Sequence, residues 1–257
     1  MLKAIEKLIS KVKREGVLAA ITAILRLPMV LWRRIAYQNL LSQPSAKQKF
    51  RELYRKNYWG SAESGSGVGS EIGYTEPLRS WLVSAIPKYN VRTFVDAPCG
   101  DFNWMRLVLE QVDVEYFGFD IVDEVIDENN QKYSSNKIHF GVADIREDEL
   151  PGCDFLMVRD CLFHLSFDDI DRFFRNIFPL DYRYLLTTTH IVESSFRNTD
   201  IRTGDFRLIN LFSLPFNFDI GSVIERIDDY PSGYSKPQEM ILIAKAHVPG
   251  KLVRTDV

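Results

Sequence analysis

Metal-binding and disulfide signatures are missing from this chain of 257 residues. It has three cysteines, and neither a metal-site spacing nor a paired framework connects them. The four histidines are scattered, and no His-x-x-x-His pair occurs. We therefore expect no metal ion. We also expect buried, unpaired thiols, which fit the reducing conditions of the cytoplasm.

A net positive charge is also missing, since the formal charge is −3 at pH 7. Without an excess of basic residues the chain has no general affinity for nucleic acid. Hydrophobic residues make up 46% of the sequence, which is enough to bury a full core. The length predicts one domain with at most a small appendage, and no internal repeat is visible.

Charge is distributed unevenly, because the first 45 residues are basic and the rest is acidic. Residues 1–40 carry eight Lys or Arg against two Glu, a net charge of +6, which leaves −9 for the remainder. Apolar residues repeat at helical spacing opposite the lysines, at Leu2, Ile5, Ile9 and Val12. We therefore predict a basic amphipathic helical arm over residues 1–45 and one α/β domain over residues 46–257.

This arm lacks an apolar run that could span a bilayer. Residues 17–32 are strongly apolar, but they contain Arg26 and Pro28 and fall short of the ~20 residues that a membrane helix needs. A small-residue cleavage pattern is absent as well, which argues against a signal peptide. Two interpretations stay open: helices that pack on the domain, or an arm that lies on an anionic membrane surface as a peripheral contact.

The segment Phe94–Trp104 is the most informative part of the domain. Its apolar start leads to Asp96, and a tight turn with one glycine, Gly100, precedes a segment that can start a helix. The Gly-x-Gly-x-x-Gly pattern that grips a pyrophosphate is missing, which disfavours a nicotinamide oxidoreductase. A turn flanked by Asp96 and Asp101 suits a phosphate-free ligand with an amine, such as S-adenosylmethionine (SAM). The alternative is an ordinary corner with a solvated acid.

Polar residues also end the next three predicted strands, at Asp120, at Asp144 and at Arg159-Asp160. In an open α/β sheet the ligand lies across the carboxyl ends of the strands. There Asp120 can accept hydrogen bonds from ribose hydroxyls, and Asp144 can reach an adenine amino group. Any single acid is more often a helix cap, but the ordered set predicts a nucleoside site.

Helices alternate with strands along the domain, which predicts a Rossmann-like, doubly wound, seven-stranded mixed sheet with helices on both faces. Residues 223–228 and 239–246 are expected to form a closing antiparallel hairpin. The predicted helices span residues 46–57, 75–86, 104–111, 123–133 and 167–177.

Four motifs carry a resemblance to a known family. They are the blocks Tyr58–Ser70, Asp96–Met105, Arg159–Leu165 and 198–211. On these blocks the chain resembles the class I SAM-dependent methyltransferases, and within them a subgroup marked by the sequence DAPCGDFNWM, whose members look like O-methyltransferases of sugars and cell-surface glycans. The resemblance runs from about residue 50 to about residue 246. Phe206 stands where many relatives carry Trp, and residues 1–45 have no counterpart.

The resemblance implies SAM as cofactor and names residues that contact it. The implied contacts are Asp96, Ala97, Gly100, Asp120, Asp144 and Ile145, to which the turn and the strand ends add Asp101, Ile121 and Arg159.

Transfer to a sugar hydroxyl needs a base, because the hydroxyl must lose its proton as the new bond forms. Asp160 and His164 are four residues apart, and we expect them to share one face of a starting helix. We predict His164 as the general base and Asp160 as its orienting group or as a second base. The alternative is that His164 caps or packs inside that helix.

Two polar segments are candidates for acceptor binding. Residues 60–73 are rich in Gly and Ser and form either a flexible linker or a binding loop. Residues 191–217 form a long insertion, and loops of this length are usually functional, although a solvated lid is the alternative. The predicted acceptor contacts are Trp59, Glu63, Arg202, Asp205, Arg207 and Asn210.

These observations predict a SAM-dependent methyltransferase that acts on a hydroxyl of a sugar or glycan. Methylation of another small molecule, a protein or a nucleic acid stays open. The segment Arg159-Asp-Cys-Leu lacks the Asn/Asp-Pro-Pro-aromatic pattern typical of base N-methyltransferases. A non-catalytic SAM-binding scaffold is a further alternative, against which the Asp160–His164 pair argues. The oligomeric state stays open.

Overall fold

The computed structural model describes residues 35–230 and 237–253. The chain divides into two compact units, residues 1–44 and residues 45–257. In the first unit residues 35–41 form a helix. Residues 1–34, most of the predicted arm, lie outside the described residues, so the packing and membrane hypotheses stay predictions. Within the described ranges no helix has the length and apolar character that crossing a membrane requires.

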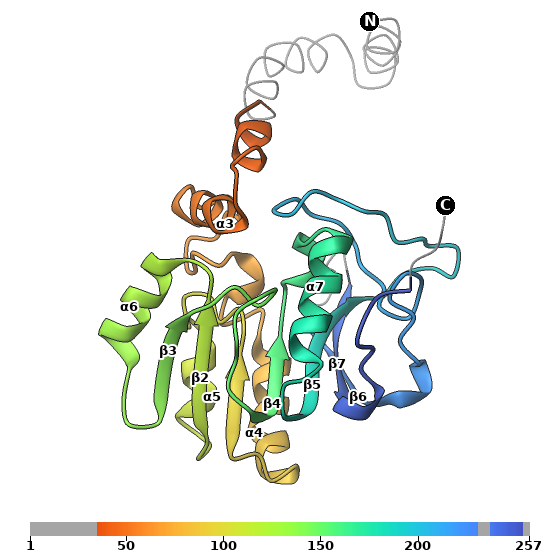
Figure 1. The fold of residues 1–257 in the computed structure, drawn as a ribbon. Coiled ribbons are helices and arrows are strands. Elements are labelled where there is room, and N and C mark those ends of the chain that lie inside the picture. Colours follow the sequence, from red (N-terminus) through yellow and green to blue (C-terminus); the bar gives the residue numbers. More distant parts are fainter. Residues whose placement is uncertain (1–34, 231–236, 254–257) are drawn as a thin grey trace, which may run out of the picture. The chain divides into compact units, whose positions relative to one another are not determined.

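The second unit is built on a seven-stranded mixed sheet with the order β3-β2-β1-β4-β5-β7-β6 (Figure 1). Strands β1 to β5 run parallel, whereas β7 pairs antiparallel with both β5 and β6. This arrangement confirms the predicted doubly wound sheet and its closing hairpin. The strands are β1 (Thr93–Asp96), β2 (Glu115–Asp120), β3 (Ile138–Val142), β4 (Cys153–Val158), β5 (Tyr182–His190), β6 (Val223–Asp228) and β7 (Gln238–Ala244).

Helices follow β1, β2 and β4 and cover both faces of the sheet, whereas β3 and β4 are joined without a helix (Figure 1). The α-helices are α3 (Ala46–Arg55), α4 (Glu76–Lys88), α5 (Met105–Leu109), α6 (Asp123–Tyr133) and α7 (Phe167–Ile177). The short 3₁₀ helices are η1 (Val68–Ser70), η2 (Leu162–His164), η3 (Ile220–Ser222) and η4 (Lys245–His247).

Helix α7 shows how local sequence determines an element. The Ser166 side chain caps the helix by accepting a hydrogen bond from the backbone N–H of Asp169. Residues 170, 173, 174 and 177 are apolar and buried, which is the i, i+3, i+4, i+7 stripe of an amphipathic helix. Burying each of these large side chains contributes about 2 kcal/mol, so the stripe holds α7 on the sheet.

Each face of the sheet has its own hydrophobic layer, because successive side chains of a strand point to opposite faces. On one face Val95, Leu156 and Leu185 lie in register and pack with α7. On the other face Phe94 and Phe155 lie in register and pack with α4 and α5. Two buried layers of this kind leave the ends of the strands as the place for polar groups.

The strand order places those polar groups together. Strand β1 lies between β2 and β4, so the chain order reverses at this point of the sheet. In doubly wound sheets a crevice opens there, outside the carboxyl ends of the strands. Asp96 ends β1 and Asp120 ends β2, while Asp144 and Arg159 closely follow β3 and β4. The fold therefore brings the four predicted strand ends to one edge.

Candidate active site

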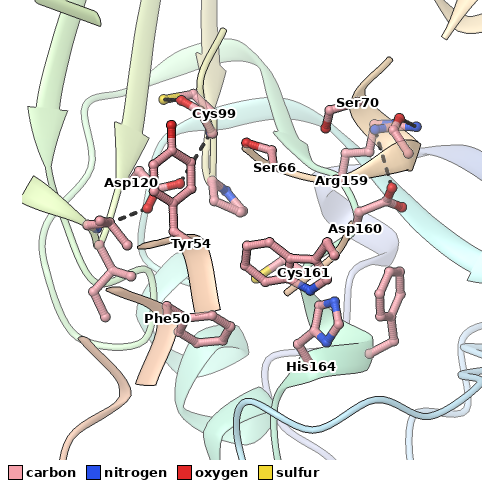
Figure 2. A pocket seen from close by; sticks show the side chains of 18 of the residues that line it. Phe50, Tyr54, Ser66, Ser70, Cys99, Asp120, Arg159, Asp160, Cys161 and His164 are labelled. Atoms are coloured by element: carbon pink, nitrogen blue, oxygen red, sulfur yellow. Dashed lines mark hydrogen bonds and ion pairs between the residues drawn. The ribbon is translucent and has the colours of Figure 1, made fainter. Parts of the chain in front are cut away.

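A cavity of about 350 Å³ lies at this edge of the sheet. Figure 2 shows Asp120 and Tyr54 on one side of it, and Asp160 and His164 on the other. Besides the strand ends, α3 and the glycine-serine loop, defined as residues 60–73, contribute to its wall. The predicted residues that line the cavity are Trp59, Asp96, Gly100, Asp120, Ile121, Asp144, Ile145, Arg159, Asp160 and His164.

The single glycine of the turn after β1 is required by the backbone. Gly100 has φ +55°, and a Cβ at this position would lie 2.3 Å from Ser66 Oγ of the glycine-serine loop. Its N–H donates to Asp120 at 3.2 Å. Gly100 therefore lets the loop and the second strand end approach the turn together.

Asp101 holds the glycine-serine loop and does not line the cavity. Its carboxylate accepts hydrogen bonds from the Ser64 hydroxyl at 2.9 Å, from the Gly65 N–H at 2.8 Å and from the Ser66 hydroxyl at 3.2 Å. The loop is thus tied to the turn by one carboxylate. The structure gives Asp101 this anchoring contact in place of the predicted ligand contact.

Two carboxylates at the cavity, Asp96 and Asp120, are deeply buried. Asp96 is 2% exposed and accepts a hydrogen bond from the Tyr116 hydroxyl at 2.8 Å. Asp120 is 8% exposed and accepts from the N–H groups of Val122 and Gly100. Burial raises the pKa of Asp96 to about 7 and that of Asp120 to about 6. A ligand with hydroxyl donors or a positive charge would offset the free-energy cost of burying these two carboxylates in their charged form.

The carboxylate after β3 is held by an arginine. Asp144 Oδ1 accepts from Arg146 Nε at 2.8 Å, and Arg146 Nη1 donates to Asp169 on α7 at 2.7 Å. Asp144 also accepts from the Arg146 backbone N–H at 3.1 Å and from Arg146 Nη2, which leaves roughly one of its four acceptor sites for another donor. Ile121 and Ile145 also line the cavity, so its β2–β3 side combines a fixed acceptor with an apolar wall.

The end of β4 carries a buried ionic cluster. Arg159 is 5% exposed and donates to both oxygens of Asp229, at 2.8 and 3.0 Å. The carboxylates of Asp160 and Asp229 raise the pKa of Arg159, so Arg159 stays charged. Asp160 lies 3.3 Å from Arg159 Nη1 and accepts from Gln238 Nε2 at 2.9 Å. The carboxylate of Asp160 is therefore fixed in the cavity wall.

The prediction that Asp160 and His164 share one face of a helix is wrong. The backbone turns left-handed at Asp160, with φ +51°. Residues 162–164 then form the single 3₁₀ turn η2, which the sequence spacing alone did not predict. The backbone N–H of Asp160 donates to Thr188 Oγ1 on β5, which holds this conformation. No hydrogen bond joins Asp160 to His164 within the described residues.

His164 is oriented by the insertion, which we define as residues 191–217. Its Nδ1 lies 2.7 Å from the backbone carbonyl oxygen of Asp205. A carbonyl only accepts, so Nδ1 carries the proton and Nε2 of the neutral ring keeps its lone pair. Burial lowers the pKa of His164 to about 4. The imidazole is thus a neutral base at pH 7, between the rings of Trp59 and Phe206 at 6.0 and 5.9 Å.

Several predicted residues do not line the cavity. Glu63 accepts hydrogen bonds from Ile72 and Asn103 and braces the glycine-serine loop. Arg202 is exposed, and Arg207 is buried behind the cavity wall. The residues outside the lining are Ala97, Asp101, Glu63, Arg202, Asp205, Arg207 and Asn210.

Several other residues line the cavity although the sequence patterns did not predict them there. Phe50 and Tyr54 lie one helical turn apart on α3, and both face the cavity. Their i, i+4 spacing on a polar helix was the available signal. Arg51 of the same helix donates to Glu124 on α6 at 2.9 Å, which holds α3 in place. Gln238 comes from β7, and no local pattern marks it.

Structural comparison places this architecture among known proteins. The magnesium protoporphyrin IX methyltransferase of Synechocystis PCC 6803, crystallised with bound SAM, matches with a TM-score of 0.55 at 11% identity, over 79% of this chain and 99% of that one. The 1,6-didemethyltoxoflavin-N1-methyltransferase of Burkholderia thailandensis, with bound S-adenosylhomocysteine (SAH), gives 0.58 at 14% identity, over 82% and 89%. A SAM-dependent methyltransferase of Leishmania major gives 0.56 at 13%, over 79% and 85%.

These matches show the class I methyltransferase fold. Sequence comparison adds nothing to this, since no protein-family model and no curated protein matches the chain. The glycan-directed subgroup therefore rests on the resemblance of motifs alone. Among the described residues, no group of His, Cys, Asp and Glu side chains is arranged to hold a metal ion.

Proposed function

We propose that this protein binds SAM in the cavity and transfers the methyl group to a hydroxyl of a sugar- or glycan-type acceptor. One observation carries the proposal: two buried carboxylates at strand ends, Asp96 and Asp120, line the same cavity as a neutral histidine, His164. The first two suit a nucleoside with an amine, and the third suits removal of a proton.

The donors and acceptors of the cavity fit SAM. Asp120 offers both oxygens to the ribose hydroxyls, and Asp96 suits the ammonium group of the methionine part. The acceptor Asp144 and the apolar Ile121 suit the adenine ring. The narrow turn at Gly100 lacks the second glycine that a pyrophosphate-binding turn needs. SAM contains no pyrophosphate, so this turn is compatible with it. When bound, SAM supplies a methyl group on a sulfonium, which leaves as a neutral thioether.

His164 is the group that accepts the acceptor's proton. Its Nδ1 is engaged by the Asp205 carbonyl, so Nε2 is the free basic nitrogen. As the acceptor oxygen forms its bond to the methyl carbon, the hydroxyl proton moves to Nε2. The pKa of about 4 keeps the ring unprotonated before the reaction.

The acceptor is placed by an aromatic wall and a fixed carboxylate. Trp59 and Phe206 flank His164, and aromatic faces pack against the C–H faces of sugars. Asp160 presents a carboxylate that Gln238 orients, and it can accept a hydrogen bond from a second hydroxyl. This combination, together with the motif resemblance, favours a polyhydroxyl acceptor.

The alternatives differ in what they bind and transfer. The structural neighbours act on unrelated acceptors, as their names state, so the fold does not select one. Methylation of another small molecule, a protein or a nucleic acid would need the same cofactor and another surface. A scaffold would bind the cofactor without transfer.

Calorimetry with SAH, followed by transfer of labelled methyl groups to a panel of sugars and glycans, tests the proposal. The proposal expects SAH binding that Asp120→Asn weakens, and methyl transfer to a hydroxyl that His164→Ala slows. Absence of SAH binding would overturn it entirely. Binding without transfer to any sugar, but with transfer to another acceptor class, would overturn the glycan assignment alone.

A further inference from the structure

The insertion closes over the turn that carries His164. Gly204 N–H donates to the His164 carbonyl oxygen at 2.7 Å, and Arg207 N–H donates to the Phe163 carbonyl oxygen at 3.2 Å. These are the two central carbonyls of residues 162–165. The backbone of the insertion therefore runs along η2 and its next residue as a hydrogen-bonded strap.

The side chain of Arg207 holds the two outer carbonyls of the same turn. Nη1 donates to Leu165 O at 2.7 Å, and Nη2 lies 3.5 Å from Leu162 O. Its guanidinium also stacks over the Phe167 ring at 4.9 Å. One planar fork therefore bridges both ends of η2, which a shorter or non-planar side chain cannot reproduce.

The guanidinium of Arg207 is buried at a cost in free energy that a packing role alone does not explain. Arg207 is 5% exposed and forms no ion pair with any residue of the described ranges. Its Nε is buried without a hydrogen-bond partner there. Burial lowers the pKa of Arg207 to about 10, which still leaves it charged at pH 7. In the part of the chain that the structure describes, the hydrogen bonds of this buried cation go only to backbone carbonyls, and beyond the Phe167 ring the charge of Asp200 alone favours its charged form. Burying a cation in this way costs free energy, and such exceptions concentrate at functional sites.

We propose that Arg207 is a positioning residue for His164, which fixes the η2 turn through the carbonyls of Leu162 and Leu165 so that Nδ1 meets the carbonyl of Asp205. This inference rests on the proposed function, in which His164 takes the hydroxyl proton. Arg207 acts through His164 and touches neither cofactor nor acceptor. This positioning role of Arg207 replaces the acceptor contact that the sequence predicted for it.

The charge of Arg207 acts on the pKa of His164 in the opposite direction to the Asp205 hydrogen bond that the arginine helps to position. A cation near the imidazole disfavours the imidazolium, so Arg207 lowers the pKa of His164. The Asp205 carboxylate opposes this effect, and the Asp205 carbonyl also favours the protonated ring. The other rings around His164 on η2, on the insertion and before the glycine-serine loop are Phe163, Phe206 and Trp59, which do not titrate.

Nitrogen NMR of the full-length, histidine-labelled protein with SAH bound tests the inference without any acceptor. The His164 signals are identified by their loss in His164→Ala. We expect a single Nδ1–H tautomer at pH 7 in the natural protein. In Arg207→Met we expect mixed tautomers, and methyl transfer slowed by about 10²-fold at unchanged SAH affinity.

Two further variants make the test specific. Arg197→Met removes an exposed arginine of the same insertion and should leave the His164 signals as they are. Arg207→Gln keeps one donor for Leu165 O but loses the charge. If Arg207→Met does not fold, Arg207→Gln should still show mixed His164 tautomers, because a single amide donor cannot bridge both carbonyls. A single, unchanged Nδ1–H tautomer in whichever Arg207 variant folds would overturn the inference. Loss of SAH binding by the natural protein would instead overturn the proposed function.

Discussion

Cofactor affinity is expected to rise with pH between 5 and 7, because Asp120 must ionise to accept the ribose hydroxyls fully. Burial raises the pKa of Asp120 to about 6. The carboxyl is therefore ionised in roughly a tenth of the molecules at pH 5 and in roughly nine tenths at pH 7. If the bound cofactor holds it ionised, affinity for SAH rises about tenfold across this range, or about 1.4 kcal/mol.

Asp96 acts in the same direction and extends the rise. Its pKa of about 7 means that binding of an ammonium beside it releases a proton near neutral pH. His164 does not contribute, since its pKa of about 4 leaves it neutral throughout. Binding of SAH should therefore release protons at pH 6, and more of them than at pH 8.

Calorimetry at several pH values, in buffers of different ionisation enthalpy, measures both the affinity and the released protons. Asp120→Asn is the matched control, because its amide keeps an acceptor oxygen but cannot titrate. We expect a shallower pH dependence in this variant, with the part due to Asp96 remaining. An SAH affinity that is constant from pH 5 to 7 in the natural protein, with no proton release, would refute the reasoning.

Other predictions concern the base, the loop anchor, the turn and the arm. His164→Ala should slow methyl transfer by ~10²–10⁴-fold while calorimetry shows unchanged SAH affinity. Asp101→Ala removes three hydrogen bonds to a charged acceptor, each contributing about 1.5–3 kcal/mol, so limited proteolysis should cut the glycine-serine loop faster and the KM for SAM should rise. Gly100→Ala should weaken SAH binding, because its Cβ would meet Ser66 and its φ is positive. Removal of residues 1–40 should reduce sedimentation with anionic vesicles, and equal binding by the shortened chain would exclude the membrane hypothesis.

The sheet and the strand-end residues that line the cavity could be predicted because their signals are local. An apolar run that ends in an acid marks a parallel strand and its carboxyl end, as at Asp96 and Asp120. The apolar stripe of α7 repeats with the helical period, so its bounds follow from the pattern. The order of strands and helices along the chain then brings the strand ends together, because few sheet topologies are compatible with that order.

The acceptor end could not be predicted to the same extent, because distant residues determine it. The left-handed conformation at Asp160 is held by Thr188, 28 residues away. His164 is oriented by Asp205, 41 residues away. The polar residues of the insertion were expected to face the acceptor, but Arg207 turns inward to hold backbone carbonyls. Sequence composition makes such a loop a candidate for acceptor binding but does not indicate which way each side chain points.

The most direct test of the central claim is a single-turnover assay that follows a labelled methyl group from enzyme-bound SAM to a sugar hydroxyl. The account predicts a methyl ether on the sugar and SAH as the second product in the natural protein. It predicts much slower transfer in His164→Ala, with SAM still bound. Bound SAM without a methyl ether on any hydroxyl acceptor, or equal rates in the two proteins, would contradict the account.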